Sequence, residues 1–181
     1  VKREMPDFIH DEALWAAAEK PEATRVSGGK VLNAIAAKLP YIVGGAADLA
    51  PSTKTYMKGA GDYSAATRDG KNMHFGIREH AMSAISNGMQ LHGGLQTYCS
   101  TFFVFSDYMK NGMRMSALMK LPVMYILTHD SIGVGEDGPT HEPIEQLAAL
   151  RTMPNMRVFR PADYRETVAA YVSALSAKCP T

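Results

Sequence analysis

The chain has 181 residues, of which 46% are hydrophobic and 20% are charged, and its formal net charge is +1. This ordinary globular balance favours one domain with a sizeable core and provides no excess charge to attract nucleic acid or a membrane surface. No apolar run approaches the roughly 18 residues that a membrane span requires, and the N-terminus lacks an apolar secretory segment, so we expect a soluble, cytoplasmic protein. Cys99 and Cys179 form no CxxC pair, which argues against a zinc knuckle or a disulfide scaffold.

The first two expected elements are helices. Residues 10–20 are rich in alanine, carry acids in their first turn and stop at Pro21, which is typical of an isolated helix in a linker. Apolar residues then recur at helical spacing over 31–39 and stop at Pro40, which predicts a packed helix. We therefore assign residues 1–23 to a linker and residues 24–181 to one domain.

Beyond residue 40, short apolar runs alternate with stretches of helical period. The expected strands are 41–43, 73–75, 95–99, 123–128 and 157–159, and the expected helices are 78–92, 102–119, 142–151 and 163–178. This alternation predicts an α/β fold with a mostly parallel sheet and helices on both faces. By the same alternation a strand should follow the last helix, so we expect the sequence to be a segment that stops before the final strand of its domain.

Polar and aromatic segments follow four of these strands. They are the long loop 46–72, the stretch "GIREH", the stretch "STFFVF" and the stretch "HDSIGVGEDGPTH". Ligands of open parallel sheets bind beyond the carboxyl ends of the strands, and loops as long as 46–72 are usually functional. We expect the four segments to meet along one edge of the sheet.

Three familiar motifs fit the segment after residue 128 poorly. Residues 133–138 match GxGxxG, but they lie four residues beyond the strand and place Glu136 and Asp137 where a pyrophosphate would bind. His141 and Glu142 do not continue to HExxH, and Pro143 would break the helix that such a metal site needs. Ser131 lacks one of the two glycines of a nucleophile elbow, so a plain loop hydroxyl is the preferred interpretation.

Two features allow both a structural and a functional interpretation. Phe102, Phe105 and Tyr108 share a helical stripe that is usually core, although an aromatic face at the end of a strand could also stack on a flat heterocycle. Glu79 follows Gly76 and falls in a first helical turn, where acids are common because they complement the helix dipole. If a partner covered this position, the desolvated carboxyl could instead hold a proton for a ring nitrogen.

Taken together and in order, four stretches carry a resemblance. "GGAADLAPS", "HFGIREHAM", "STFFVFSDY" and "THDSIGVGEDGPTHEPIEQLAALR" make the sequence over about residues 20–181 similar to the pyrimidine-binding (middle) domain of the transketolases. The resemblance implies the thiamine-diphosphate-binding fold and the transfer of a two-carbon ketol unit from a ketose phosphate to an aldose phosphate. It also implies a cytoplasmic homodimer that acts in the pentose phosphate pathway.

The resemblance assigns the cofactor's pyrimidine half to this segment. Glu79 matches the glutamate that hydrogen-bonds the aminopyrimidine ring nitrogen of thiamine diphosphate. Phe102, Phe105 and Tyr108 match the aromatic pocket around that ring, and Asp48 matches an acid near the thiazolium and the subunit boundary.

Five further residues match positions that contact substrate. Arg25, Ser52 and His129 match residues that hold the phosphate of a sugar phosphate, for which a cation, a hydroxyl and an imidazole are suited. Asp137 matches the acid that contacts the sugar's C2 hydroxyl. His141 matches an imidazole near the reacting carbonyl, suited to proton transfer or to stabilising an oxyanion.

The sequence departs from the family at two residues and in one signature. Thr53 follows Ser52 where the family often has asparagine. Glu142 stands where many relatives have glutamine, and the GDG-to-Asn-Asn signature for Mg²⁺ and the diphosphate is missing. We expect those groups to be held by the preceding domain of a neighbouring subunit, so that the segment alone is inactive. A dihydroxyacetone synthase, which uses formaldehyde as acceptor, and a non-catalytic α/β partner subunit remain as alternatives.

Overall fold

The computed structural model describes residues 7–16 and 20–181 and contains one parallel sheet of four strands. The strand order is β2-β1-β3-β4, and the strands are β1 (Ile42–Ala46), β2 (Asn72–His74), β3 (Gln96–Phe102) and β4 (Met124–Thr128). Every neighbouring pair is parallel. The predicted α/β class is confirmed, and four of the five expected strands are present within two or three residues of their expected bounds.

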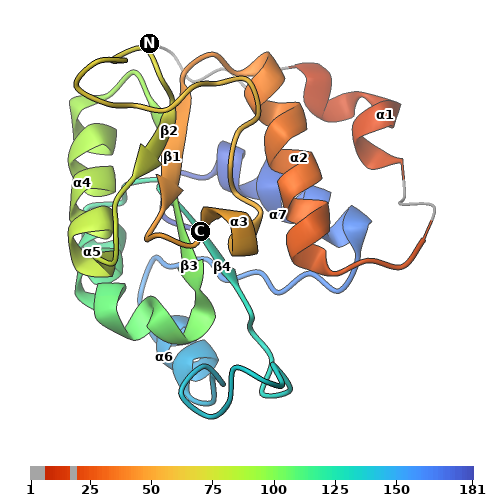
Figure 1. The fold of residues 1–181 in the computed structure, drawn as a ribbon, viewed down its shortest axis with the longest axis vertical. Coiled ribbons are helices and arrows are strands. Elements are labelled where there is room, and N and C mark those ends of the chain that lie inside the picture. The colour runs from red at the N-terminus through yellow and green to blue at the C-terminus, as the bar shows by residue number, and fades with distance from the viewer. Residues whose placement is uncertain (1–6, 17–19) are drawn as a thin grey trace.

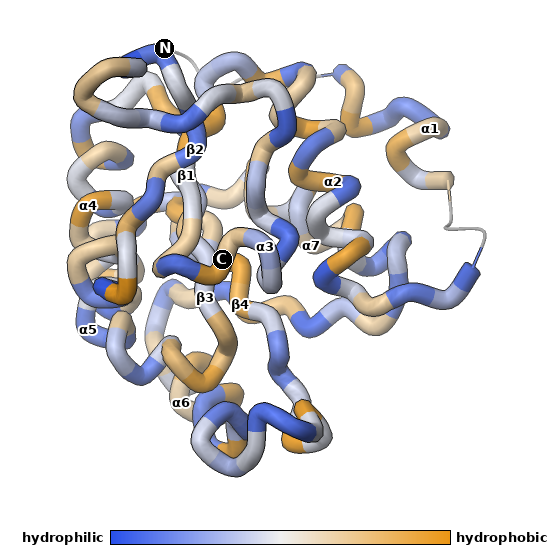
Figure 2. Tube along the Cα trace, viewed as in Figure 1, coloured by the Kyte–Doolittle hydropathy of each residue, from blue (hydrophilic) through white to orange (hydrophobic). Residues whose placement is uncertain are grey.

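Helices cover both faces of the sheet (Figure 1). On one face lie α4 (Glu79–His92) and α5 (Ser106–Leu118), and on the other lie α2 (Thr24–Lys38) and α7 (Tyr164–Ser176). Each face has its own core, one built around Val31, Leu32 and Ile35 of α2 and the other around Met82, Met109 and Met113. Figure 2 colours the same trace by hydropathy and shows hydrophobic and hydrophilic positions alternating along these helices.

One buried polar network joins the sheet to α4 and α5. The hydroxyl of Tyr125 on β4 shares its single hydrogen between Asn87 Oδ1 of α4 at 3.2 Å and Ser116 Oγ of α5 at 2.9 Å. Asn87 in turn donates to the carbonyl of Gly112 at 2.9 Å. A Cβ at Gly112 would overlap Ser83, so the glycine allows the two helices to approach closely enough for this bond.

The N-terminal helix is shorter than predicted. In the described residues, a 3₁₀ turn η1 (Asp7–His10) leads to α1 (Glu12–Trp15), and Ala16 is already extended at ψ 123°. Asp11 caps α1 by accepting from Ala13 N at 3.0 Å. Residues 17–19 of the expected helix lie outside the described residues.

The expected strand at residues 157–159 is wrong. Residues 157–159 belong to no strand, and Arg157 N donates to Pro180 O at 3.0 Å instead of to β4. Thr181 occupies the position beside β4, donating to Val123 O at 3.1 Å and accepting from Tyr125 N at 2.8 Å in the parallel pattern. An apolar run beside a sheet forms a strand only if a neighbouring backbone is available, and here Pro180 and Thr181 lie between it and β4.

Three shorter elements lie beyond the ends of the strands. They are α3 (Ala50–Thr53), the 3₁₀ turn η2 (Phe103–Phe105) and α6 (Gln146–Arg151). The helix expected over 102–119 is therefore a strand end, a 3₁₀ turn and an α-helix, and the helix expected over 142–151 begins only at Gln146. The buried Gln146 holds α6 to α5 by donating to Asp107 Oδ2 at 2.8 Å.

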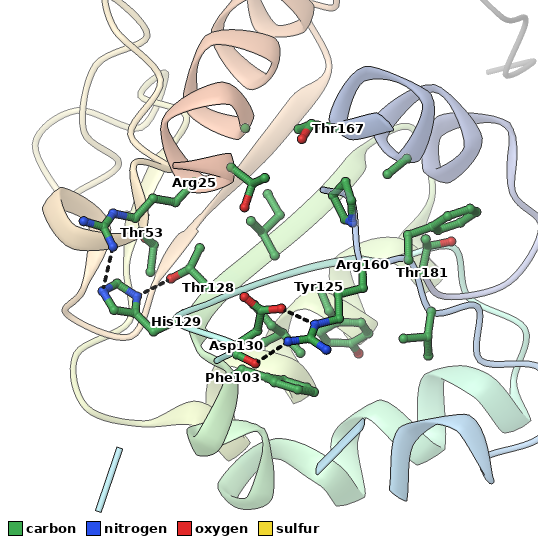
Figure 3. A pocket seen from close by; sticks show the side chains of 18 of the residues that line it. Arg25, Thr53, Phe103, Tyr125, Thr128, His129, Asp130, Arg160, Thr167 and Thr181 are labelled. Atoms are coloured by element: carbon green, nitrogen blue, oxygen red, sulfur yellow. Dashed lines mark hydrogen bonds and ion pairs between the residues drawn. The ribbon is translucent and has the colours of Figure 1, made fainter. Parts of the chain in front are cut away.

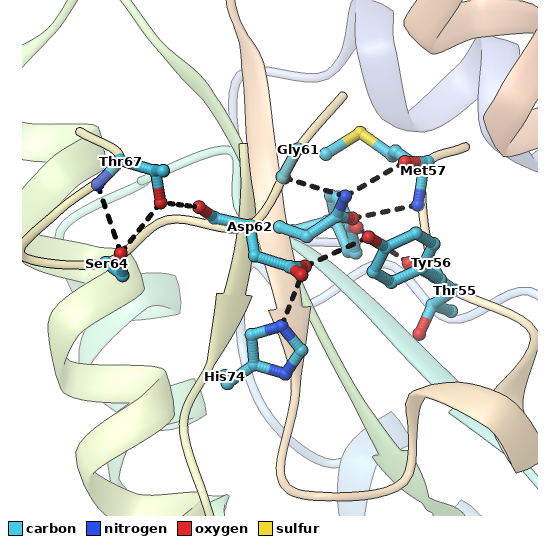
Figure 4. Close-up of polar contacts among 10 residues, drawn as sticks. Thr55, Tyr56, Met57, Gly61, Asp62, Ser64, Thr67 and His74 are labelled. Carbon is cyan, nitrogen blue, oxygen red and sulfur yellow. Dashed lines mark hydrogen bonds and ion pairs between the residues drawn. The ribbon is translucent and has the colours of Figure 1, made fainter. Parts of the chain in front are cut away.

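The long loop between β1 and β2 is organised by side-chain hydrogen bonds (Figure 4). Asn72 accepts from Met57 N at 2.8 Å and donates to the carbonyls of Met57 and Gly61 at 2.9 and 3.0 Å. Nearer the surface, Asp62 accepts from Tyr56 Oη at 3.0 Å and lies 2.9 Å from His74 Nε2. The loop therefore has a defined course across the β2 side of the sheet.

Membrane-spanning helices and disulfides are both features that the sequence argues against. Within residues 7–16 and 20–181, no helix is both long and apolar enough to cross a membrane. Cys99 and Cys179, both in the described part of the chain, are free thiols. Burial raises the pKa of the Cys99 thiol to about 12, so this cysteine is un-ionised.

Candidate active site

The carboxyl ends of the four strands lie along one edge of the sheet, because all strands are parallel. The loop carrying Asp48 and Ser52 follows β1, the turn at Gly76 follows β2, Phe102 ends β3 and His129 follows β4. The predicted convergence of the four segments on one edge is confirmed.

Glu79 is the first residue of α4 and is buried, with only 8% of its surface exposed. Gly76 reaches φ 68°, a left-handed conformation that permits the sharp exit from β2, and Arg78 closes the turn by donating to Phe75 O at 3.1 Å. No described residue forms a hydrogen bond or ion pair with the Glu79 carboxyl group. Its carboxyl oxygens are not among the fully enclosed, unpaired side-chain atoms of the described residues, so the group is still accessible to a hydrogen-bond partner from outside the chain.

Five aromatic and imidazole rings cluster beyond β3. Phe102 stacks on Phe105 with centroids 5.9 Å apart and on His129 at 3.7 Å, and Phe105 lies 5.9 Å from Tyr108. His141 approaches Phe105 edge-on at 5.2 Å. The prediction that Phe102, Phe105 and Tyr108 share one helix is wrong, because Phe102 ends a strand and only Tyr108 lies in α5. The three rings nevertheless form one cluster.

His129 connects this cluster to α2 (Figure 3). Its Nε2 lies 3.3 Å from Arg25 Nη1, and its Nδ1 lies 2.8 Å from Thr128 Oγ1. The backbone of His129 is left-handed at φ 55°, an arrangement that costs energy in a residue with a side chain and is often found at functional sites. Burial and the nearby Arg25 guanidinium lower the pKa of His129, so that it is neutral at neutral pH.

The loop from β4 to α6 brings the remaining predicted residues to this edge. Asp137 lies near enough to His129 to oppose the lowering of its pKa. His141 Nδ1 lies 2.9 Å from Thr140 Oγ1. Asp130, next to His129 in the chain, forms an ion pair with Arg160, Nε to Oδ2 at 2.6 Å.

Two alternative motifs have no structural counterpart. The residues 133–138 of the GxGxxG match are followed by loop, and the next helix, α6, begins only at Gln146. Within the described segments, no three His, Cys, Asp or Glu side chains are grouped as they would be around a metal ion.

Asp48 and Ser52 are on the same edge but remain apart from the ring cluster. Both side chains are exposed and have no hydrogen bond with any described residue. Asp48 has φ 61°, which makes it a second non-glycine residue in the left-handed region directly beyond a strand. The structure thus groups Arg25, Phe102, Phe105, Tyr108, His129 and His141 through contacts, while Asp48, Ser52 and Glu79 share only the edge.

Two residues of this region were not predicted from the sequence. Thr128 contacts the ring of His129, and Arg160 holds Asp130. Both line a cavity of about 480 Å³ that lies between β4, the start of α2 and α7. The adjacency of Thr128 to a histidine at a strand end was a usable signal for the first residue, whereas Arg160 lies 30 positions from Asp130 and left no local pattern.

Known proteins resemble this chain closely. The family described as "Transketolase, pyrimidine binding domain" matches residues 20–181. The transketolase of Bacillus subtilis (strain 168) is 55% identical over 175 residues, which cover 97% of this chain and 26% of that protein. The chain therefore spans about a quarter of that relative's length.

Solved structures agree with the sequence match. The transketolase from Leishmania mexicana aligns with a TM-score of 0.94 at 42% identity, over 99% of this chain and 27% of that one. A transketolase from Pichia stipitis in complex with sedoheptulose 7-phosphate aligns with a TM-score of 0.91 at 42% identity, over 98% of this chain and 28% of that one. With the sheet order, the edge geometry and the sequence match in agreement, the chain belongs to the transketolase family, within its pyrimidine-binding domain.

Proposed function

We propose that this chain is the pyrimidine-binding part of an enzyme that transfers a two-carbon ketol unit from a ketose phosphate to an aldose phosphate. The observation that carries the proposal is the Glu79 carboxyl group, which is buried at the start of α4 and has no partner among the described residues. Such a group can hold a proton next to a weakly basic ring nitrogen without losing it to water.

The chain's residues fit the pyrimidine half of thiamine diphosphate. When bound, the cofactor supplies an acidic thiazolium carbon suited to making and breaking bonds beside a carbonyl. Glu79 hydrogen-bonds the pyrimidine ring nitrogen and holds the proton there. Phe102, Phe105 and Tyr108 would pack against the ring face and exclude water, which the contacts among their own rings support. Asp48 would lie near the thiazolium and the subunit boundary.

The substrate residues fit a phosphorylated sugar. Arg25, Ser52 and His129 hold the phosphate, and the contact between Arg25 and His129 supports a shared role. Asp137 contacts the C2 hydroxyl and so reads the sugar's stereochemistry. His141, held against Phe105, moves a proton at the reacting carbonyl oxygen or stabilises negative charge there.

A second domain completes the site in this proposal. Mg²⁺ and the diphosphate require ligands that the described residues do not group, so they are assigned to the diphosphate-binding domain of the neighbouring subunit in a homodimer. Apolar side chains exposed near the edge support such a covering partner, since Ile77 is 80% and Ile144 70% exposed. The proposal includes a cytoplasmic location and a place in the pentose phosphate pathway.

An acceptor assay on the enzyme that contains this chain tests the proposal. With thiamine diphosphate, Mg²⁺ and xylulose 5-phosphate, we expect turnover with ribose 5-phosphate as acceptor. Turnover with formaldehyde in its place would identify a dihydroxyacetone synthase, and no cofactor-dependent turnover with either acceptor would favour a non-catalytic partner. Tight calorimetric binding of thiamine diphosphate and Mg²⁺ by these 181 residues alone would contradict the assignment of the diphosphate site elsewhere.

A further inference from the structure

The hydrogen-bond partners of His129 fix the position of its proton. Arg25 Nη1 lies 3.3 Å from Nε2, and a guanidinium can only donate, so Nε2 must accept with its lone pair. In a neutral imidazole the other nitrogen then carries the hydrogen, so Nδ1 donates to Thr128 Oγ1 at 2.8 Å. Figure 3 shows the ring between these two partners.

The surroundings of His129 hold the ring in this orientation. Phe102 stacks on one face with centroids 3.7 Å apart and an interplanar angle of 28°. Thr128 is buried at the end of β4, so its hydroxyl has little access to water. The charged or titratable groups around the ring are Arg25 from α2 and Asp130, Asp137 and His141 from the loop after β4.

The neutral form of His129 is a poor ligand for an anion. Phosphate oxygens need hydrogen-bond donors, whereas Nε2 here presents a lone pair on the side of the ring where Arg25 lies. Once Nε2 is protonated it becomes a donor, and Nδ1 can still donate to Thr128 because both nitrogens of an imidazolium carry hydrogens.

We propose that binding of a phosphate group at this site takes up one proton at His129 Nε2, and that Thr128 is the positioning residue that keeps Nε2 pointed at the anion. This rests on the proposed function, in which Arg25 and His129 hold the substrate's phosphate. The proton comes from solvent, the hydrogen bond from Arg25 moves from Nε2 to a phosphate oxygen, and no covalent bond other than the new N–H is formed or broken.

The proposal sets a direction for the pH dependence of binding. Burial and Arg25 lower the pKa of His129 in the free protein, while a bound dianion raises it. Proton uptake is therefore largest between these two pKa values, and the affinity for the phosphate falls as the pH rises through the pKa of the bound state. The neutral ring in the free protein also avoids repulsion of the adjacent Arg25 cation.

Calorimetry in buffers of different ionisation enthalpy measures the uptake directly. The enzyme containing this chain is titrated with ribose 5-phosphate between pH 7 and 9, with no ketose donor present, and with ribose as the unphosphorylated control. We expect uptake on the order of one proton per ribose 5-phosphate at the lower end and a decline toward pH 9. Ribose should bind without this uptake.

Variants locate the proton and test the role of Thr128. In His129→Gln the uptake should disappear while weaker, pH-independent binding through Arg25 remains. Thr128→Val, a close isostere, should lower the affinity about tenfold, the size expected for a hydrogen bond to a charged group, and should shift the histidine ¹⁵N NMR signals from the Nδ1–H toward the Nε2–H tautomer. Thr128→Ser should restore both. Thr152→Val, at the exposed C-cap residue of α6, should change neither.

Three results would overturn the inference. Saturable binding of ribose 5-phosphate without proton uptake would refute it and leave the proposed function standing. Uptake that survives in His129→Gln would place the proton on another group, and wild-type behaviour of Thr128→Val would refute the positioning role. No saturable binding of ribose 5-phosphate would refute both this inference and the proposed function.

Discussion

Two halves of the carboxyl edge differ in how far the chain completes them by itself. We call the group beyond β3 and β4 the imidazole half, and it consists of Arg25, Phe102, Phe105, Tyr108, Thr128, His129 and His141. The residues beyond β1 and β2 form the acid half, which consists of Asp48, Ser52 and Glu79. In the imidazole half each ring has a partner within the chain, whereas the acid half has no internal side-chain hydrogen bonds.

The two halves therefore differ in how far contacts within the chain set their side-chain geometry before a ligand binds. Packing fixes the geometry of the imidazole half before any ligand arrives, which reduces the ordering required on binding. In the acid half the Glu79 carboxyl group has no partner among the described residues, so its hydrogen bonds are left to water or to a partner from outside the chain. Substitutions should therefore affect function in the acid half and both stability and function in the imidazole half.

The largest effect should come from Glu79→Gln. Because the amide cannot hold the transferable proton, we expect turnover of the intact enzyme to fall by about 10²–10⁴-fold, the usual contribution of a positioned proton donor. Folding should be unharmed, since no described partner of Glu79 is lost. Steady-state kinetics and urea unfolding check the two parts, with Glu12→Gln on α1 as the matched control. Full activity in Glu79→Gln would remove the functional role of the acid half.

A second substitution pair compares two rings of the imidazole half. Phe102→Ala should lower the free energy of unfolding by about 3–5 kcal/mol, because the ring is buried and stacked on Phe105 and His129. Tyr108→Ala should change it by less than about 0.5 kcal/mol, because this side chain is 66% exposed. Urea unfolding of the chain measures both. Equal costs would mean that the cluster is not prebuilt as described.

The Tyr125 hydroxyl connects the elements that carry the two halves. It bonds Asn87 of α4, the helix that begins at Glu79, from β4, the strand that His129 follows. Tyr125→Phe should cost about 1–3 kcal/mol, because Asn87 loses its buried donor. Tyr171→Phe is the matched control, since that buried hydroxyl has no hydrogen-bond partner among the described residues. Thermal or urea unfolding distinguishes the two, and an equal loss in both would argue against the network.

The smallest effect concerns Asp62, in the loop that borders the acid half. Hydrogen bonds from His74 and Tyr56 lower the pKa of Asp62, so its contribution to stability is present above pH about 4 and is lost as the pH falls through the lowered pKa. Asp62→Asn should therefore lower stability slightly above pH about 4, change it little below the lowered pKa of Asp62, and so reduce the acid-side slope of the unfolding midpoint. An unchanged slope below pH 4 would show that the exposed contact contributes nothing.

Most of the architecture was predictable because it depends on local periodicity. The helical spacing over residues 31–39 and the alternation of short apolar runs with helices gave the two-faced parallel sheet. The failed strand at residues 157–159 has the same local character as the others, and only the position of Pro180 and Thr181 between it and β4 distinguishes it.

In the candidate site, too, some features follow from local sequence and others depend on tertiary packing. The sequence by itself determined which residues reach the carboxyl edge, because the motifs sit at strand ends and parallel strands bring those ends together. Only the tertiary structure decided that Phe102 stacks on His129, that Glu79 is buried without a partner, and that Arg25 bonds a ring 104 positions away. Such contacts depend on how distant elements pack, and no local pattern in the chain encodes the proton position that follows from them.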